Sequence, residues 1–421
     1  MARKAETVVG LDLGTTKVAC IVGEVTETGV DIIGVGSTPS RGMAQGSVVH
    51  IEAAADAIRR AVEEAELMAG MEVRDVITGI AGSHIRGMNC HGIVAVDKEI
   101  RSEDVRRVID RARAVAGRDD DGVIHVIPQE FIVDDQEGIR SPVGMSGCRL
   151  EARVHVVTAG KTASLNITRA CNEAGLNVTE MALQQLASAE AVLTRDERDM
   201  GVALVDVGGG TTDVAVFLKG AVVHTAVLPL GGNHLTSDIA SGLRTPKDEA
   251  ERLKHKYGCA LTSLVAPDEE MEVPSVGGRP PRKRARQVLS EIIEARMEEI
   301  LCLVRREIDN AGLLHHIHSG MVLTGGSTMV RGLTELAEDI FEMDVRQGAP
   351  TGVGGLTNVI ANPKFATGVG LVLQAAAPLR LDASADNVVA PDFASITGDH
   401  ALRSEHPGAW NRFVTWMGDR F

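Results

Sequence analysis

Short apolar runs broken by glycine-rich turns open the chain and recur in its second half. Residues 8–13 and 18–22 are apolar and flank a turn that begins at Asp12, which predicts a strand, a tight turn and a second strand. Residues 202–207 and 214–218 repeat this plan around a turn with the same order of Asp, Gly and two Thr. The pattern therefore predicts an internal repeat, with two related lobes that face each other.

The rest of the pattern predicts a third turn, several helices and the loops between them. An apolar run at 321–323 precedes the glycine-containing residues 324–332 and predicts a strand, a turn and the start of a helix. Residues 52–69 are rich in Ala and Glu, residues 102–116 open with a helix-start signal, and residues 287–310 repeat apolar positions three or four apart, so each segment predicts a helix. Polar segments predict loops at 117–122 and 266–282 and a flexible linker at 381–405.

Composition narrows the class of protein. The chain has 421 residues, of which 44% are hydrophobic and 24% charged, as expected for a globular protein of two or more domains. The formal net charge of −15 argues against nucleic acid as a partner and confines any contact with anionic lipid to a local segment. Six cysteines are scattered without a CxxC pair, so we expect neither a cysteine metal site nor a disulfide framework.

The three glycine turns carry groups suited to phosphate. Glycine lets backbone N–H groups approach phosphate oxygens, while threonine hydroxyls and Lys17 add donors and positive charge. The predicted phosphate-binding residues are Gly14, Thr15, Thr16, Lys17, Gly208, Gly209, Gly210, Thr211 and Thr212. Asp12 and Asp206 end their strands at the cleft, where we expect them to hold hydrated Mg²⁺. One such turn alone is usually a plain turn, and it is the order of the three that predicts a nucleotide site.

The sequence around these turns resembles a known family. VGLDLGTTKVACIVGEV, VDVGGGTTDVAVF and LTGGSTMVRGL are similar to the phosphate-1, phosphate-2 and adenosine motifs of the superfamily of actin, DnaK-type chaperones and sugar kinases. With LASAEAVL, LPLGGNHLTSDIA, EAERLKHKYG and FATGVGL, they resemble FtsA, the actin-like family of bacterial cell division, from residue 7 to about residue 375.

That resemblance implies an α/β, actin-like, two-lobed ATPase fold with an FtsA-type 1C subdomain, followed by a linker and an amphipathic helix. The implied parts are a first lobe (1A) at 1–83 and 159–200, the 1C interaction module at 84–158, a second lobe (2A) at 201–228 and 319–380, subdomain 2B at 229–318, the linker at 381–405 and the amphipathic helix at 406–421.

The resemblance also implies how the nucleotide is held and how fast it is hydrolysed. The implied adenosine-binding residues are Glu251, Lys254, Gly325, Gly326, Ser327 and Met329. Relatives often have Glu-Pro before LASAEAVL, where this chain has Gln184 and Gln185. We expect Gln184 to position water near the γ-phosphate, and slow hydrolysis of ATP at best, because a neutral amide is not a base at neutral pH.

A basic segment, PPRKRAR at 280–286, stands out in an acidic chain. A solvated loop and helix start would explain it, and so would a dock for an acidic peptide. In FtsA the second lobe receives the C-terminal peptide of the tubulin-like FtsZ, so the resemblance implies Arg286 and Arg296 as peptide contacts. It also implies self-association into filaments, and other cell-division partners at the 1C module.

The last residues predict an amphipathic helix. Aromatic residues make up only 2% of the chain, yet both tryptophans lie in this segment. On a helix that Pro407 can open, the apolar side chains share one face, which predicts a helix lying in the membrane interface. The expected lipid contacts are Trp410, Phe413, Val414, Trp416, Met417 and Phe421. A helix docked on the body of the protein is the alternative.

The resemblance implies an ATP-binding protein that polymerises and tethers FtsZ filaments to the cytoplasmic face of the cell membrane at the division site. Three other classes share the core motifs. A sugar kinase needs a positioned Asp base, for which we find no motif, and a chaperone ATPase needs a substrate domain beyond residue 380. A pilus-assembly relative shares the core, and the predicted tail helix argues against it.

Overall fold

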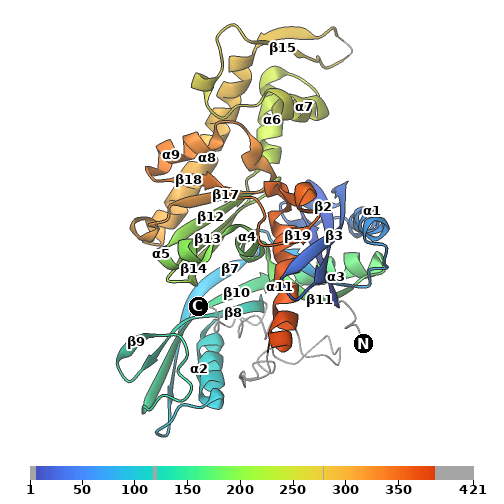
Figure 1. Ribbon diagram of the computed structural model, residues 1–421. Helices are drawn as coiled ribbons and strands as arrows, with labels where there is room; N and C mark the ends of the chain where they lie inside the picture. The colour runs from blue at the N-terminus through green and yellow to red at the C-terminus, as the bar shows by residue number, and fades with distance from the viewer. Residues whose placement is uncertain (1–5, 117–120, 278, 385–421) are drawn as a thin grey trace.

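Two central sheets with matching strand order form the framework of the molecule (Figure 1). The computed structural model describes residues 6–116, 121–277 and 279–384. The first sheet has the order β11-β6-β1-β2-β3-β19, and the second has the order β14-β13-β12-β17-β18. Strands of the first sheet are β1 (Glu6–Leu13), β2 (Lys17–Val25), β3 (Val30–Pro39), β6 (Asp75–Ile80), β11 (Asn177–Leu183) and β19 (Gly354–Gly355). Those of the second are β12 (Val202–Val207), β13 (Thr212–Leu218), β14 (Ala221–Leu228), β17 (Met321–Thr324) and β18 (Val345–Gln347).

The predicted internal repeat is present in the pairing of these strands. In the first sheet β1 is antiparallel to β2 and parallel to β6. In the second sheet β12 is antiparallel to β13 and parallel to β17. Each hairpin is closed by one glycine turn, so the two turns occupy equivalent positions. One hydrophobic core lies mainly in the first lobe and extends to one face of the second sheet, and another lies within the second lobe.

Helices cover both faces of the first sheet. Helix α1 (Ile51–Ala69) packs on β2 and β3, and α11 (Ala366–Ser384) packs on β1 and β2 from the other face (Figure 1). Helix α1 begins where His50 accepts a hydrogen bond from the Ala53 N–H, and it ends at Gly70 in the left-handed conformation. Helix α11 continues to Ser384, past residue 381 where the linker was expected to begin.

The second lobe carries a helical extension at the top of Figure 1. Its elements are α6 (Gly232–Leu243), α7 (Lys247–Tyr257), α8 (Arg286–Asn310), β15 (Glu270–Val273) and β16 (Arg282–Ala285). Helix α9 (Leu333–Phe341) packs on α8 and β18, beside the second sheet. The prediction of a loop at 266–282 was wrong in part, because β15 lies within it and pairs antiparallel with β16. Buried Met271 and Val273 alternate with exposed residues along β15, a short two-residue period that the polar neighbours obscured in the sequence.

A third sheet of order β7-β10-β8-β9 forms a separate module with its own core. Its elements are β7 (Arg86–Ala95), β8 (Asp121–Val133), β9 (Gln136–Ile139), β10 (Arg149–Gly160) and α2 (Ser102–Val115), which packs on β7 and β10. Strand β8 begins at Asp121, so the last two positions of the loop predicted at 117–122 belong to a strand, and the others lie outside the described residues.

Helix α4 (Gln184–Val192) and α5 (Arg195–Met200) connect the end of the first sheet to the start of the second. The remaining elements are α3 (Lys161–Glu173), α10 (Thr357–Ile360), β4 (Met43–Ala44) and β5 (Ser47–Val48), with 3₁₀ turns at Thr262–Leu264, Leu314–His316, Gly326–Met329 and Pro363–Phe365. Among the helices of the described part of the chain, none combines the length and the hydropathy that crossing a bilayer requires.

Candidate functional site

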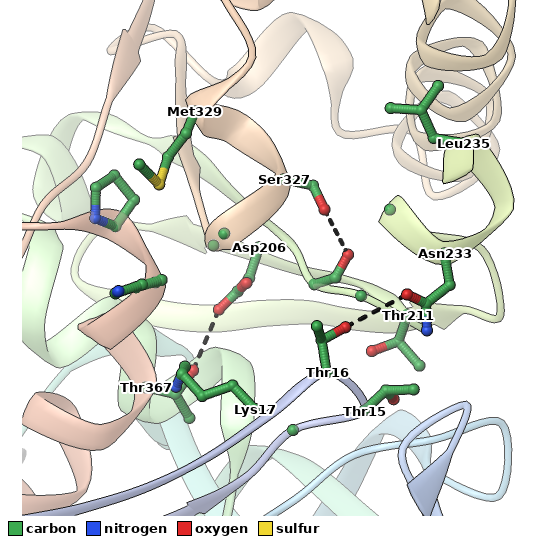
Figure 2. Close-up of a pocket in the computed structure, with 18 of the residues that line it drawn as sticks. Thr15, Thr16, Lys17, Asp206, Thr211, Asn233, Leu235, Ser327, Met329 and Thr367 are labelled. Atoms are coloured by element: carbon green, nitrogen blue, oxygen red, sulfur yellow. Dashed lines mark hydrogen bonds between the residues drawn. The ribbon is translucent and has the colours of Figure 1, made fainter. Parts of the chain in front are cut away.

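A cavity of about 300 Å³ lies where the glycine turns of the two lobes face each other (Figure 2). Most of the predicted nucleotide-site residues line it. They are Asp12, Gly14, Thr15, Thr16, Lys17, Gln184, Asp206, Gly208, Gly209, Thr211, Glu251, Lys254, Gly325, Gly326, Ser327 and Met329. The cavity therefore brings together residues that are far apart in the sequence.

The first turn carries its own pair of opposite charges. The Gly14 N–H donates to the Lys17 carbonyl, which closes the turn between β1 and β2. The Lys17 ammonium lies 2.6 Å from Asp12 Oδ2, and both side chains are largely buried. The Thr15 hydroxyl accepts a hydrogen bond from the Gly46 N–H. Lys17 is therefore held at the mouth of the turn, facing the cavity.

The second turn closes in the same way but carries more acid. The Gly208 N–H donates to the Thr211 carbonyl at 2.9 Å, as in the first turn. Asp206 and Asp213 flank this turn, and the Thr211 hydroxyl donates to Asp213 Oδ2. Within the described residues, Asp213 Oδ1 is buried without a hydrogen-bond partner, although Asp213 lines the cavity. A buried acceptor of this kind favours a donor or a cation supplied by a ligand.

Burial raises the pKa of both acids of the second turn, Asp206 and Asp213. It raises the pKa of the Asp206 carboxyl to about 6, where the Ser188 hydrogen bond opposes the rise and Asp12 adds to it. Burial and the neighbouring Asp206 raise the pKa of Asp213 to about 8. The charged forms of these acids are thus unfavourable in the cleft, and a cation would stabilise them.

The two turns approach each other so closely that glycine is required between them. A Cβ at Gly209 would overlap the Thr16 hydroxyl, and a Cβ at Gly210 would overlap Thr15. The Thr16 hydroxyl also donates to the Asn233 side-chain oxygen at 3.4 Å (Figure 2). Backbone N–H groups of both turns therefore border the same narrow space, as phosphate binding requires.

The opposite end of the cavity contains the residues expected for adenosine. Lys254 pairs with Glu251 at 2.7 Å and also donates to the Gly232 carbonyl and the Thr236 hydroxyl. The third turn, Gly326–Met329, borders this end, and the Ser327 hydroxyl donates to the Gly208 carbonyl of the second turn. This end is therefore ordered by hydrogen bonds already made within the protein.

Two of the predicted phosphate ligands do not line the cavity. Thr212 begins β13 and points to the other side of the hairpin, where its hydroxyl donates to the Leu230 carbonyl. Gly210 borders Thr15 but is not part of the cavity wall. Side chains alternate along a strand, so Thr211 and Thr212 cannot both face the same space.

Gln184 is the first residue of α4 and lines the cavity, whereas Gln185 is buried and points away, toward the Ala226 carbonyl.

The two predicted partner-peptide residues lie outside the cavity and are already paired. Arg286 contacts Glu269 at 2.5 Å, and Arg296 contacts Asp238 at 2.5 Å. The predicted lipid contacts of the tail lie outside the described residues.

Several residues that line the cavity were not predicted from the sequence, among them Asp213, Asn233, Lys364 and Thr367. Asp213 stands in the second motif of the sequence, where it was given no role, and the structure places it within β13. A polar residue between buried strand positions was the signal that could have found it. Thr367 lies in FATGVGL on α11, and no local pattern connects that helix to the glycine turns.

Similarity to solved structures defines the fold. The chain matches a PilM-PilN type IV pilus biogenesis complex with a TM-score of 0.63 and 17% identity, covering 88% of this chain and 98% of that one. It matches MreB5 of Spiroplasma citri bound to ADP with a TM-score of 0.55 and 14% identity, covering 90% and 99%. At such identities the likeness shows the fold alone, and that fold is the two-lobed actin-like ATPase fold that the sequence predicted.

Sequence similarity gives the family. The model of the cell division protein FtsA matches residues 203–370, and that of the SHS2 domain inserted in FtsA matches residues 82–158. Curated FtsA proteins of Pseudomonas aeruginosa PAO1 and Escherichia coli K12 are 50% and 47% identical, over 88% of this chain and 89% and 90% of theirs. FtsA of Bacillus subtilis 168 is 41% identical over 87% of this chain and 83% of its own. The chain belongs to the FtsA family of cell division proteins.

Proposed function

We propose that the cleft binds ATP with Mg²⁺. The observation that carries this proposal is the facing pair of glycine turns, one with Lys17 and the other with the buried acids Asp206 and Asp213. Backbone N–H groups and Lys17 fit a phosphate chain, and the acids fit a hydrated divalent cation. Asp12 and Asp206 would hold that cation through its waters, which supplies charge neutralisation for the phosphates and the acids alike.

Equilibrium binding of a fluorescent ATP analogue to the full chain tests this proposal. We expect saturable binding that ATP displaces, and tighter binding with Mg²⁺ than with EDTA, because the cation offsets repulsion between phosphate and the acids. Titration with a GTP analogue gives the control for base preference. Absence of saturable binding by ATP in the presence of Mg²⁺ would refute the proposal.

Turnover at this site is proposed to be slow. Gln184 lines the cavity at the start of α4, and its amide can orient water but does not take up the proton of that water at neutral pH. Replacing Gln184 with Glu supplies a base, and we expect faster phosphate release than in the wild type. Gln136→Glu, at an exposed position of β9, is the matched control for the added charge.

On the basis of family membership, we propose that the protein assembles into filaments and links FtsZ filaments to the cytoplasmic face of the membrane at the division site. In this proposal the domain limits are those predicted from the sequence, with other cell-division partners at the 1C module of residues 84–158. The separate sheet and core of that module support its treatment as an interaction unit.

The FtsZ contact is proposed at Arg286 and Arg296 on α8. Each arginine has an intramolecular acid, Glu269 or Asp238, so an acidic peptide would have to compete with that acid. We expect the double replacement by Glu to abolish binding of an FtsZ C-terminal peptide in an anisotropy titration. Arg60→Glu, exposed on α1 of the first lobe, controls for a general change of charge, and unchanged affinity of the double variant would rule this site out.

The membrane contact is proposed for the predicted tail helix at 406–421. Co-sedimentation with liposomes of anionic and neutral lipid tests it, using the full chain and a chain ending at residue 400, with and without ATP. We expect the full chain to sediment and the shorter chain to remain in solution, with ATP increasing the sedimented fraction through self-assembly. Equal sedimentation of both chains would contradict the anchor.

A further inference from the structure

Asp206 is held from behind by two buried hydroxyl groups. Ser188 Oγ donates to Asp206 Oδ2 at 2.6 Å, and Thr367 Oγ1 lies 3.4 Å from the same oxygen. The two hydroxyl oxygens are 2.9 Å apart, and the residues are 0% and 8% exposed. An ionised carboxylate only accepts hydrogen bonds, so the Ser188 hydroxyl donates to Asp206. The distance from Thr367 to Ser188 is shorter than that from Thr367 to Asp206, which favours an arrangement in which Thr367 donates to Ser188. Figure 2 shows Thr367 directed at Asp206.

These hydroxyls belong to the two helices that join the lobes. Ser188 lies in the middle of α4, which runs from the first sheet toward the second, and Thr367 lies at the start of α11, which packs on β1 and β2. The helices cross closely, since a Cβ at Gly370 of α11 would overlap the Ala187 carbonyl of α4. A change in the arrangement of the lobes would therefore move the hydroxyls relative to Asp206, which ends β12 of the second lobe.

The surroundings of Asp206 explain why such support is needed. Its electrostatic neighbours are Asp12, Asp213 and Lys17, and Lys17 makes its short contact with Asp12 instead. Repulsion from Asp12 and Asp213 favours rotation of the Asp206 carboxylate away from the cavity. A hydrogen bond to a carboxylate fixes its orientation, and in metal sites such outer partners control how well the carboxylate receives the cation.

We propose that Ser188, backed by Thr367, is a positioning residue that orients Asp206 for the divalent cation of the nucleotide. The site for the cation is then complete only when α4 and α11 cross as they do here, so cation binding reports the arrangement of the lobes. This inference rests on the proposed binding of ATP with Mg²⁺.

The test compares Ser188→Ala with Thr367→Val and with Ser290→Ala. Ser290 is the matched control, because it is also buried in a helix but its hydroxyl donates to a backbone carbonyl, that of Cys259, and not to a carboxylate proposed to hold the cation. For each full-length variant, affinity for the fluorescent ATP analogue is measured in EDTA and over a series of Mg²⁺ concentrations, and the melting temperature is recorded.

We expect Ser188→Ala to raise the Mg²⁺ concentration at half effect by about tenfold or more. Affinity in EDTA should stay near the wild-type value. Thr367→Val should give a smaller shift of about threefold, since its hydroxyl acts mainly through Ser188. Ser290→Ala should lower the melting temperature and leave the Mg²⁺ dependence unchanged.

Two results would overturn the positioning role. One is a wild-type Mg²⁺ dependence in both Ser188→Ala and Thr367→Val. The other is equal loss of affinity in EDTA and in Mg²⁺, which would show that Ser188 only maintains the fold. If the wild type itself binds ATP without any effect of Mg²⁺, the proposed cofactor is wrong and the inference falls with it, so the two failures can be told apart.

Discussion

The turn at Asp12 and the turn at Asp206 are copies of one structural plan with opposite electrostatic character. Each closes a hairpin with the same hydrogen bond, from Gly14 to Lys17 in one and from Gly208 to Thr211 in the other. In the first turn the aspartate has its own cation, Lys17, at 2.6 Å. In the second, the aspartate is held by hydroxyls and has a further acid, Asp213, nearby.

The difference shows how a repeat can become a nucleotide site. Two identical acidic turns would repel each other and the phosphates, whereas two identical neutralised turns would have no need for a metal ion. The observed pair supplies a fixed cation, Lys17, on one side and two buried acids that would hold a divalent cation on the other. The division of roles can be tested one turn at a time.

The largest effect is expected from Lys17→Met, which removes the fixed cation. Affinity for ATP should fall by about 100-fold, because a hydrogen bond to a charged group contributes about 1.5–3 kcal/mol. The free energy of unfolding should fall as well, since Asp12 would be left buried without its partner. Titration with the fluorescent analogue and urea denaturation measure the two effects, with Lys219→Met as the control, and undiminished affinity would remove the distinction between the turns.

A second test uses pH to detect the excess acid. Burial raises the pKa of Asp213 from its ordinary value of 3.8 to about 8 in the folded protein, so between these values the native state binds more protons than the unfolded state. In EDTA, wild-type stability should therefore fall as pH rises through this window. Asp213→Asn should gain about 2 kcal/mol relative to wild type between about pH 5.5 and pH 7. Urea denaturation across this range measures the difference, and the exposed Asp56→Asn controls for general charge.

The contact between the turns is the third target. In Gly209→Ala the new methyl group meets the Thr16 hydroxyl, so the lobes should close less fully over the phosphates. Overpacking of about 1–3 kcal/mol corresponds to about tenfold weaker binding of ATP. Gly160→Ala is the matched control, because the added Cβ there meets only His84 at an ordinary distance of 3.4 Å. Equal affinities of both variants would mean that the turns need not touch.

The smallest effect is expected outside both turns, where the third sheet meets the second lobe. His155 bridges Asn89 and Thr225, and burial lowers its pKa to about 3. The unfolded state therefore binds more protons between that value and 6.5, and stability falls as pH drops below 6.5. His155→Gln should remove about 0.8 kcal/mol of that loss at about pH 6. A pH response equal to that of the wild type would assign the acid sensitivity to other groups.

Much of the fold could be predicted because its signals are local. Apolar runs ending in Asp-Gly-Thr turns located both hairpins, and α8 appeared within one residue of its predicted start. Features that depend on contacts between distant segments could not be predicted. Arg286 and Arg296 look free in the sequence, but Glu269 and Asp238 reach them through folding.

In the candidate site, too, the residues with local signals were predicted and those that depend on distant contacts were not. Glycine and threonine in the turns were found by type and spacing, although strand alternation turns Thr212 away. Ser188 and Thr367 are small residues in apolar helices, which local patterns interpret as packing positions. Their role becomes visible only when the crossing of α4 and α11 places both beside Asp206.

The chain connections of the third sheet determine how easily its module could be replaced. Arg86 at the start of β7 pairs directly with Thr158 near the end of β10, so the chain enters and leaves the module at one point. A module whose two ends lie side by side can be replaced by a module of different shape, or by a short loop, without a change in the strand order of the first sheet. Lineages built on one nucleotide-binding body could thus acquire new assembly surfaces by substitution at a single junction.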